Sequence, residues 1–376
     1  MARKTILAVL AAAALTAGCG AEQKAVDGGA NAQPPALYAV GPNVVGLPTG
    51  PARLASPPVA PLAGWLTPAA VPSSDGRYLA YNTWRELRPD DPALSWSDQG
   101  IEPGDPLATP SIRLYDAATR TDAVFEPGAF SLAWRSDGAL AYFKGAERDY
   151  RAGRPYEGDV VVRASLDAPP EIWSPAKARY VVAAWARQRL VAYREGEGEA
   201  LDVVVFDGPG RMRVLAHDSA LVAISPDGRR AFVERGPADG PPAVLVVDVA
   251  DGTEKAALDL TTVDPAVGAV NYAGDWRADR VVASSASGLA VFRVRPGSIE
   301  LERTLVTAEG QALAEPRFAD PSGQRVAAWA SKAEGGVFLD CDLFEGRCEQ
   351  TVPLPNGRGV NGFPTWRRPL YNPSRP

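Results

Sequence analysis

The sequence predicts an all-β fold, a β-propeller whose blades are four-stranded antiparallel sheets, seven blades in number. Three observations lead to this prediction. A hairpin motif recurs along the chain, equivalent turns at Gly76, Gly138, Gln188 and Gly228 are 62, 50 and 40 residues apart, and 36 Gly and 35 Pro fall largely between short apolar runs. The chain has 376 residues, 46% of them hydrophobic, which suits one large repeat architecture.

The first eighteen residues have the features of an export signal. Arg3 and Lys4 give a basic start, and residues 5–16 form an apolar stretch too short to span a bilayer. The small residues 15–18 then precede Cys19. This segment resembles the bacterial lipoprotein signal, with Thr16 where Leu is commonest. The resemblance implies cleavage before Cys19 and acylation of that cysteine, for example with palmitate; an ordinary cleavable signal with an incidental cysteine is the alternative.

Residues 19–34 predict a flexible tether, because after Cys19 they are small or polar and show no periodicity. The expected organisation is therefore a signal peptide at 1–18, a tether at 19–34 and the propeller at 35–376. No later segment has 18 to 20 uninterrupted apolar residues. The lipid bilayer is thus the first expected partner, reached through acylated Cys19. We expect the protein on the outer side of the cytoplasmic membrane, or in the outer membrane or periplasm.

Each predicted blade consists of two hairpins. The first hairpin ends in Ala followed by an aromatic residue in its best copies, and Asp-Gly often occupies its turn because both residues tolerate the positive φ of a strand-matched turn. The first hairpins cover residues 71–81, 133–142, 184–193, 223–232, 275–283 and 318–327, and the second hairpins cover residues 112–125, 160–173, 203–215, 244–258, 289–305 and 337–352. Six complete blades result.

The last two cysteines, Cys341 and Cys348, lie on either side of a predicted hairpin tip at residues 345–346. Their spacing suits a disulfide across that hairpin, which an oxidising compartment would keep closed. A metal pair is the alternative, but two further ligands are missing nearby.

The two ends of the chain predict a seventh blade. Residues 361–371, which include Trp366, repeat the first hairpin and then stop, while residues 36–47 resemble a second hairpin without its first. A ring of sheets leaves few exposed strand edges only when it closes. We therefore expect the terminal strands to join in one closing blade; a six-bladed ring with both ends packed on it is the alternative.

The repeat also carries a resemblance to a known family. Ser225-Pro226-Asp227-Gly228, followed by Arg, a further residue and Ala-aromatic, resembles the repeat of TolB-like propellers. These are related to WD40 repeats and to the propellers that precede some prolyl-oligopeptidase-type hydrolases. The resemblance covers residues 36–376 and implies the fold. It does not extend to the small α/β domain that precedes the propeller in TolB, so it does not carry over TolB's role.

Charge and motifs exclude several functions. The formal net charge is -6, and loss of Arg3 and Lys4 with the signal leaves -8, which argues against nucleic-acid binding. The chain has no Gly-x-Ser-x-Gly motif and no Walker or dinucleotide-binding motif, so we expect no cofactor. Its single histidine, His217, adjoins Asp218 and Ser219, and three neighbours along one segment cannot converge as a triad does. No catalytic residue and no metal ligand is predicted.

Carboxylates are the remaining source of catalysis. The acidic, Pro-rich segment 88–105 offers oxygen ligands for a cation or a general acid, but it lacks the spacing of a calcium loop. A solvated insertion is the simpler interpretation. The alternative function is thus a propeller enzyme, hydrolase or lactonase-like, that uses carboxylates in the channel and a divalent cation.

Long loops predict where a partner binds. Loops between the second and third strands of a blade emerge on one face, and those at 82–110 and 144–159 carry the aromatic and Arg residues typical of protein interfaces. These are Trp84, Arg85, Arg88, Trp96, Arg148, Tyr150, Arg151, Arg154 and Tyr156. By contrast, Trp134, Trp185, Trp276 and Trp366 recur at one repeat position and are expected in the core. The predicted function is a noncatalytic binding or scaffold lipoprotein whose partner is an envelope protein or small ligand; loops that merely cover the ring are the alternative.

Overall fold

The computed structural model describes much of the chain between residues 36 and 353. The described ranges are 36–40, 43–47, 60–61, 71–73, 77–83, 111–116, 118–119, 121–145, 157–195, 201–236, 242–263, 270–285, 288–306, 313–318, 323–332 and 335–353. They contain 27 strands and one short 3-10 helix, η3 (Leu260–Thr262). No helix in these ranges is long and apolar enough to cross a bilayer. The prediction of an all-β fold is confirmed.

Six four-stranded antiparallel sheets follow the chain in order, and we number them blades 1 to 6. Blade 1 contains β4 (Val71–Pro72), β5 (Tyr78–Thr83), β6 (Ser111–Asp116) and β7 (Thr121–Pro127). Blade 2 contains β8 (Ala129–Trp134), β9 (Leu140–Gly145), β10 (Gly158–Arg163) and β11 (Glu171–Ile172). Blade 3 contains β12 (Tyr180–Ala186), β13 (Arg189–Glu195), β14 (Leu201–Gly208) and β15 (Arg211–Ala216).

The second half of the chain repeats the pattern. Blade 4 contains β16 (Ser219–Ile224), β17 (Arg230–Arg235), β18 (Ala243–Asp248) and β19 (Glu254–Asp259). Blade 5 contains β20 (Val270–Arg277), β21 (Arg280–Ser285), β22 (Gly288–Arg295) and β23 (Ser298–Val306). Blade 6 contains β24 (Leu313–Phe318), β25 (Arg325–Lys332), β26 (Gly335–Asp342) and β27 (Arg347–Pro353). All six predicted blades are therefore present.

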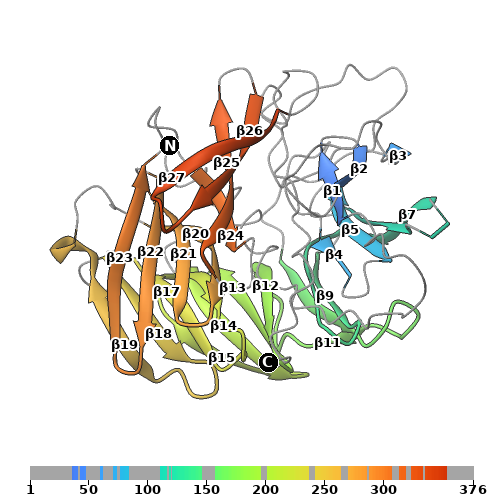
Figure 1. The fold of residues 1–376 in the computed structure, drawn as a ribbon. Helices are drawn as coiled ribbons and strands as arrows, with labels where there is room; N and C mark the ends of the chain where they lie inside the picture. Colours follow the sequence, from blue (N-terminus) through green and yellow to red (C-terminus); the bar gives the residue numbers. More distant parts are fainter. Residues whose placement is uncertain are drawn as a thin grey trace, which may run out of the picture.

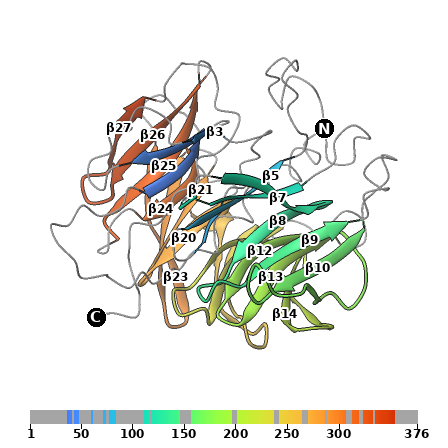
Figure 2. The same ribbon diagram turned by 90° about the vertical axis from the view of Figure 1, so that its right-hand side faces the viewer.

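Consecutive blades pack side by side, chiefly through their first strands. Strand β8 contacts β12, β16 contacts β20, and β20 contacts β24. Figure 1 shows the blades following one another around an arc, and Figure 2 shows the same series after a 90° turn. The arrangement is that of a propeller, with the first strand of each blade placed innermost.

The N-terminal segment forms a separate three-stranded sheet of β1 (Ala36–Val40), β2 (Asn43–Leu47) and β3 (Ala60–Pro61). The expected hairpin at 36–47 is present, and β3 adds a strand that the sequence does not predict. The proposed closing partner at 361–371, with Trp366, lies outside the described residues. Closure of a seventh blade therefore stays a prediction.

The Asp-Gly turns differ from the expectation in one respect. Gly138 and Gly228 have φ values of +92° and +63°, but Asp227 is not among the residues with positive φ. Its carboxylate instead accepts hydrogen bonds from the Arg229 amide (3.1 Å) and the Ser225 hydroxyl (2.6 Å). Both residues tolerate positive φ, but only the glycine adopts it in this copy, because the five residues between β16 and β17 need that geometry at one position only.

Two blades make the same connection without glycine. In blade 3 Ala186 pairs with Arg189, and in blade 5 Arg277 pairs with Arg280, which leaves two residues in each turn. The first turn residue has positive φ in both cases, +59° at Arg187 and +50° at Ala278. A non-glycine residue with positive φ is strained. In these two turns the pairing of the flanking strands holds the residue in that conformation despite the strain.

The recurring tryptophans lie in the core, as predicted for those in the described ranges. Trp134, Trp185 and Trp276 are each at most 7% exposed. The indole N–H of Trp185 donates to the Ala133 carbonyl oxygen of the preceding blade (3.0 Å), so the side chain satisfies its polar atom while it fills the space between two sheets.

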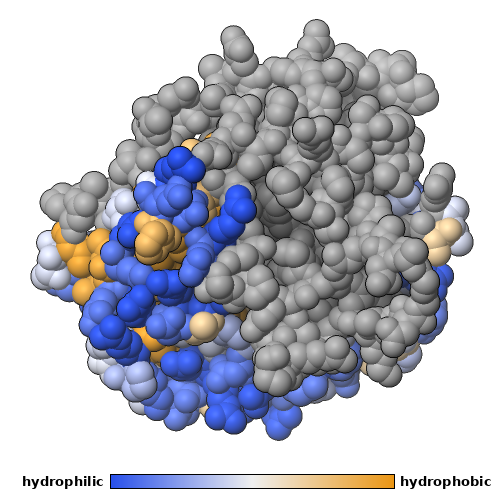
Figure 3. Space-filling model, viewed as in Figure 1, coloured by the Kyte–Doolittle hydropathy of each residue, from blue (hydrophilic) through white to orange (hydrophobic). Residues whose placement is uncertain are grey.

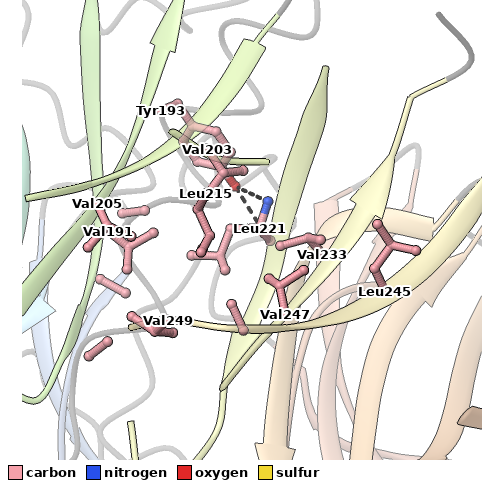
Figure 4. Packing of buried hydrophobic residues seen from close by; sticks show 14 of the residues in the cluster. Val191, Tyr193, Val203, Val205, Leu215, Leu221, Val233, Leu245, Val247 and Val249 are labelled. Carbon is pink, nitrogen blue, oxygen red and sulfur yellow. Dashed lines mark hydrogen bonds between the residues drawn. The ribbon is translucent and has the colours of Figure 1, made fainter. Parts of the chain in front are cut away.

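Side chains also bond main-chain groups across blade boundaries. The Tyr193 hydroxyl of blade 3 donates to the Leu221 carbonyl of blade 4 (2.9 Å) and accepts from the Leu221 amide (3.0 Å), inside a cluster of valines and leucines from both sheets (Figure 4). The Val182 amide donates to the buried Ser131 hydroxyl (3.0 Å), and the Phe318 amide to the Asp275 carboxylate (3.1 Å). Neighbouring blades are thus joined by polar bonds as well as by apolar contact.

Candidate functional site

Two faces of the propeller differ in what they carry. Loops between second and third strands, and the connections between blades, end on what we call the loop face; the turns within each hairpin end on the opposite face. The nine predicted binding residues, Trp84, Arg85, Arg88, Trp96, Arg148, Tyr150, Arg151, Arg154 and Tyr156, all lie outside the described residues, as does Cys19. The described strand ends show the base from which the loop-face segments rise.

The base of the blade 2 loop is tightly fixed. Gly145, the last residue of β9, pairs with Gly158, the first residue of β10. The Gly158 amide donates to the Ala178 carbonyl (3.0 Å) and the Gly145 amide to the Gly128 carbonyl (3.0 Å). A Cβ atom on Gly158 would overlap the Lys144 carbonyl oxygen and lie 2.7 Å from Gly145 Cα. The loop that carries Arg148 to Tyr156 therefore starts and ends at positions set by backbone packing.

A buried ionic network lies beside this base. The Glu126 carboxylate accepts hydrogen bonds from Lys144 Nζ, from the Tyr142 hydroxyl (2.9 Å) and from Arg163 Nη2 (3.1 Å), and Arg163 Nε donates to Tyr142 (3.1 Å). Burial by itself raises the pKa of Glu126, but these three donors outweigh it and hold the pKa below its ordinary value. Burial raises the pKa of Tyr142 to about 12, so the phenol stays protonated and donates.

A second network lies on the loop face of blade 3. Asp202 accepts a hydrogen bond from Arg194 Nη2 (2.8 Å), and its other carboxylate oxygen lies 3.1 Å from His217 Nδ1. The His217 side chain is 70% exposed. The Ser219 hydroxyl donates to the main-chain oxygen of His217 (2.6 Å) and not to the ring. The His-Asp-Ser neighbours therefore form no nucleophile–base pair, as expected from their adjacency.

Carboxylates at these strand ends are consistently paired with cations or hydroxyls. Arg179 Nη1 donates to Glu195 (2.6 Å), and the Ser174 hydroxyl donates to Asp159 (3.0 Å). In the described ranges no group of three or more His, Cys, Asp or Glu side chains could hold a metal ion. The acidic segment 88–105 lies outside these ranges.

The ionisation of the described carboxylates bears on the enzyme alternative. Every one with a resolved shift has its pKa lowered: Asp116, Glu126, Asp137, Asp227, Asp251, Asp259, Glu302 and Asp342. A general acid that works near neutral pH needs a raised carboxyl pKa. These side chains suit fixed charge pairing and turn formation, and they do not suit proton donation.

The opposite face holds a repeated Asp that the sequence reasoning missed. Asp248 and Asp342 end the third strands of their blades, and the carboxylate of each accepts a hydrogen bond from the amide two residues later (2.7 Å at Ala250, 2.8 Å at Phe344). Asp116 does the same at Ala118 (2.8 Å). In two copies, Asp248 and Asp342, the Asp precedes a turn Gly by four residues, a pattern that marks these two second hairpins and was available in the sequence.

Blade 6 carries the disulfide. Cys341 of β26 and Cys348 of β27 face each other in register and are joined by an S–S bond. The hairpin tip between them is held further by its own hydrogen bonds, with the Gly346 amide donating to the Asp342 carbonyl (2.9 Å).

Taken together, the sheet order, the innermost first strands and the hairpin turns define a β-propeller protein. No known protein family and no curated protein matches the chain. Several solved structures match the chain in fold. The β-propeller domain of the Trilobed protease from Pyrococcus furiosus is 13% identical and matches with a TM-score of 0.51, over 85% of this chain and 94% of that domain.

Two further solved structures are similar to the chain. An oligogalacturonate lyase in complex with manganese is 11% identical, with a TM-score of 0.51 over 79% of this chain and 81% of the lyase. TolB from Acinetobacter baumannii is 12% identical, with a TM-score of 0.47; the match covers 88% of this chain but 65% of the TolB chain. At these identities the likeness concerns the fold and assigns no activity.

Proposed function

We propose that this protein is an exported β-propeller that is anchored to a bilayer through acylated Cys19 and binds a partner on its loop face without catalysing a reaction. The main support is the base of the blade 2 loop, where paired glycines and the Glu126 network fix the ends of a segment rich in Arg and Tyr. A rigid base that presents adaptable side chains is the usual construction of a binding surface.

The charge pairs support binding over catalysis. Glu126, Glu195 and Asp202 are each bonded to Arg or Lys, so their charge is fixed and already neutralised. Such pairs set the local shape and potential of a surface and thereby favour some partners over others. The lyase with manganese shares the fold, but its metal is not carried over to this chain.

The anchor can be tested at one residue. The segment before Cys19 supports acylation, and the Cys341–Cys348 disulfide supports an oxidising compartment outside the cytoplasm. Cells grown with an alkyne-labelled fatty acid are expected to label the wild-type chain and not Cys19→Ala, with the variant released from the membrane fraction. Equal labelling of both proteins, or an unlabelled wild type, would remove the anchor from the proposal.

The binding face can be tested by a combined substitution. Replacement of Trp96, Arg151 and Tyr156 by Ala is expected to remove the products that the wild-type chain forms in envelope cross-linking, because these side chains supply the aromatic and guanidinium contacts. The matched control replaces Arg295 and Glu300, an exposed pair on the opposite face (3.4 Å), by Ala. Unchanged cross-linking in the triple variant, with the fold intact by circular dichroism, would contradict the loop face as the binding site.

A further inference from the structure

The hairpin tip of blade 6 exposes a large aromatic side chain. Among the described residues three large hydrophobic side chains are exposed: Val124 at 42%, Ile172 at 56% and Phe344 at 82%. Phe344 lies at the turn between β26 and β27, on the opposite face. Figure 3 shows the described surface on one side of the molecule as largely hydrophilic with small, separate apolar spots. A phenyl ring this exposed is thus unusual for the described surface.

The tip that carries Phe344 is held rigid. The Cys341–Cys348 disulfide closes the hairpin, and the adjoining Leu343 is buried in the blade 6 core at 7% exposure. The ring therefore projects from a fixed base. Because the tip is already ordered, contact with a partner costs little further conformational entropy.

Several backbone groups of the tip also have hydrogen-bond partners within the protein. The amides of Phe344 and Glu345 both donate to the Asp342 carboxylate (2.8 and 2.9 Å), and the Leu343 amide donates to the Gln324 carbonyl (2.7 Å). Arg303 Nη1 donates to the Phe344 carbonyl oxygen (3.1 Å). Entry into a lipid interface is unfavourable for free backbone groups, and here those groups have internal partners.

Arginines lie at the base of the tip that carries the exposed ring. Arg303 bonds the tip directly, Arg347 forms an ion pair with Glu345 (2.6 Å), and Arg325 lies in register with Asp342 across the sheet. Three guanidinium groups and the carboxylates of Asp342 and Glu345 therefore lie at the base of the tip. An exposed aromatic ring with arginines at its base suits the headgroup region of an anionic bilayer, where the ring enters the interface and the guanidinium groups meet phosphates.

We infer that the Phe344 tip docks on the bilayer to which the protein is anchored. This inference rests on the proposed anchor at Cys19. Sixteen residues, 20–35, separate Cys19 from the first described strand, and a chain of that length reaches at most about 55 Å when extended. The bilayer thus stays within reach of the propeller, and its high effective concentration makes a weak contact sufficient. Docking would fix which face of the propeller meets the membrane.

The experiment replaces the acyl anchor so that the two proposals can fail separately. Residues 20–376 with an N-terminal hexahistidine tag are tethered to vesicles of phosphatidylcholine and phosphatidylglycerol that contain a nickel-chelating lipid. Hydroxyl-radical footprinting then compares the tethered and free protein. Modification of Phe344 is expected to fall at least about fivefold on the vesicles, while Ile172, an exposed apolar control, changes less than about twofold.

Substitution gives a second measurement. Without nickel, flotation of the untethered chain with the same vesicles is expected to fall about tenfold for Phe344→Glu and to stay unchanged for Ile172→Glu. Equal modification of Phe344 on and off the vesicles would overturn the inference, as would protection that appears only when envelope proteins are added. Because the tag replaces Cys19, neither result depends on acylation. Absence of fatty-acid labelling in the earlier experiment would contradict the acyl anchor and would not bear on these two measurements.

Discussion

At the scale of single residues, Gly158 shows how a side chain can be excluded by backbone proximity. Any Cβ at this position overlaps the Lys144 carbonyl and approaches Gly145 Cα, and both groups belong to the paired strand. Backbone atoms held in a sheet cannot move aside as a flexible side chain can. The glycine is therefore required by the loop base itself.

Gly158→Ala is expected to lower the free energy of unfolding by about 3 kcal/mol, since the strands must separate to admit the methyl group. Urea denaturation measures this loss. Gly138→Ala is the comparison, because a Cβ there meets no atom within 4 Å and only its φ of +92° opposes it; we expect a loss of about 1 to 2 kcal/mol. An equal or smaller loss at Gly158 would show that the two strands are not held together as described.

Some residue roles could be predicted and others could not. Burial of Trp134, Trp185 and Trp276 follows from their repeated position. Asp116, Asp248 and Asp342 end the third strands of three blades, and in two of these copies the spacing from Asp to the turn Gly is visible in the sequence. The Glu126 network could not be predicted, since its members come from β7, β9 and β10 and meet only through the packing of two blades.

At the scale of structural elements, that network ties the outer strand of blade 1 to the middle strands of blade 2. Its carboxylate is ionised in the folded protein and has a lowered pKa. A carboxyl group whose pKa is lower in the folded than in the unfolded chain stabilises the fold above its unfolded pKa, and this stabilisation is lost as pH falls through the folded pKa.

Glu126→Gln is therefore expected to cost about 2 to 3 kcal/mol at pH 7, because Lys144 and Arg163 lose their anion. Below the ordinary Glu value of 4.5 the wild-type stability falls with pH, and the variant should fall less steeply. Urea denaturation from pH 7 to pH 3 tests both points. Asp137→Asn, which breaks an ion pair whose carboxylate is 51% exposed, is the control and should cost less than about 1 kcal/mol. Parallel pH profiles for wild type and Glu126→Gln would contradict this assignment.

Short strands limited what the sequence could reveal about elements. The two-residue strand β3 has too few residues to show any alternation and belongs to no repeat, whereas the equally short β11 (Glu171–Ile172) lies in the second hairpin predicted at 160–173. The long, β-branched third strands such as β14 and β18 were predicted because each is a run of buried valines bounded by turn residues. A short strand was thus predictable only where the hairpin repeat marked its place.

At the scale of the whole molecule, six of the predicted blades are present and the closing blade is untested. Removal of residues 354–376 distinguishes a seven-bladed ring closed by both termini from a six-bladed ring. If residues 361–371 complete the sheet begun by β1 to β3, truncation exposes apolar surface and strand edges and should lower the unfolding free energy by more than about 3 kcal/mol. Thermal and urea denaturation measure it. A truncated chain as stable as the full one would favour the six-bladed ring.

The polar bonds between blades also govern how the molecule opens. The amides of Val182, Leu221 and Phe318 each donate a hydrogen bond to a side chain of the preceding blade. Separation of any of these pairs of sheets would therefore leave a buried amide without its acceptor. Peeling away one blade at a time is therefore disfavoured. Hydrogen exchange at these three amides should report a single, shared opening event, in contrast to the stepwise fraying of elongated repeat arrays whose units meet through apolar contact alone.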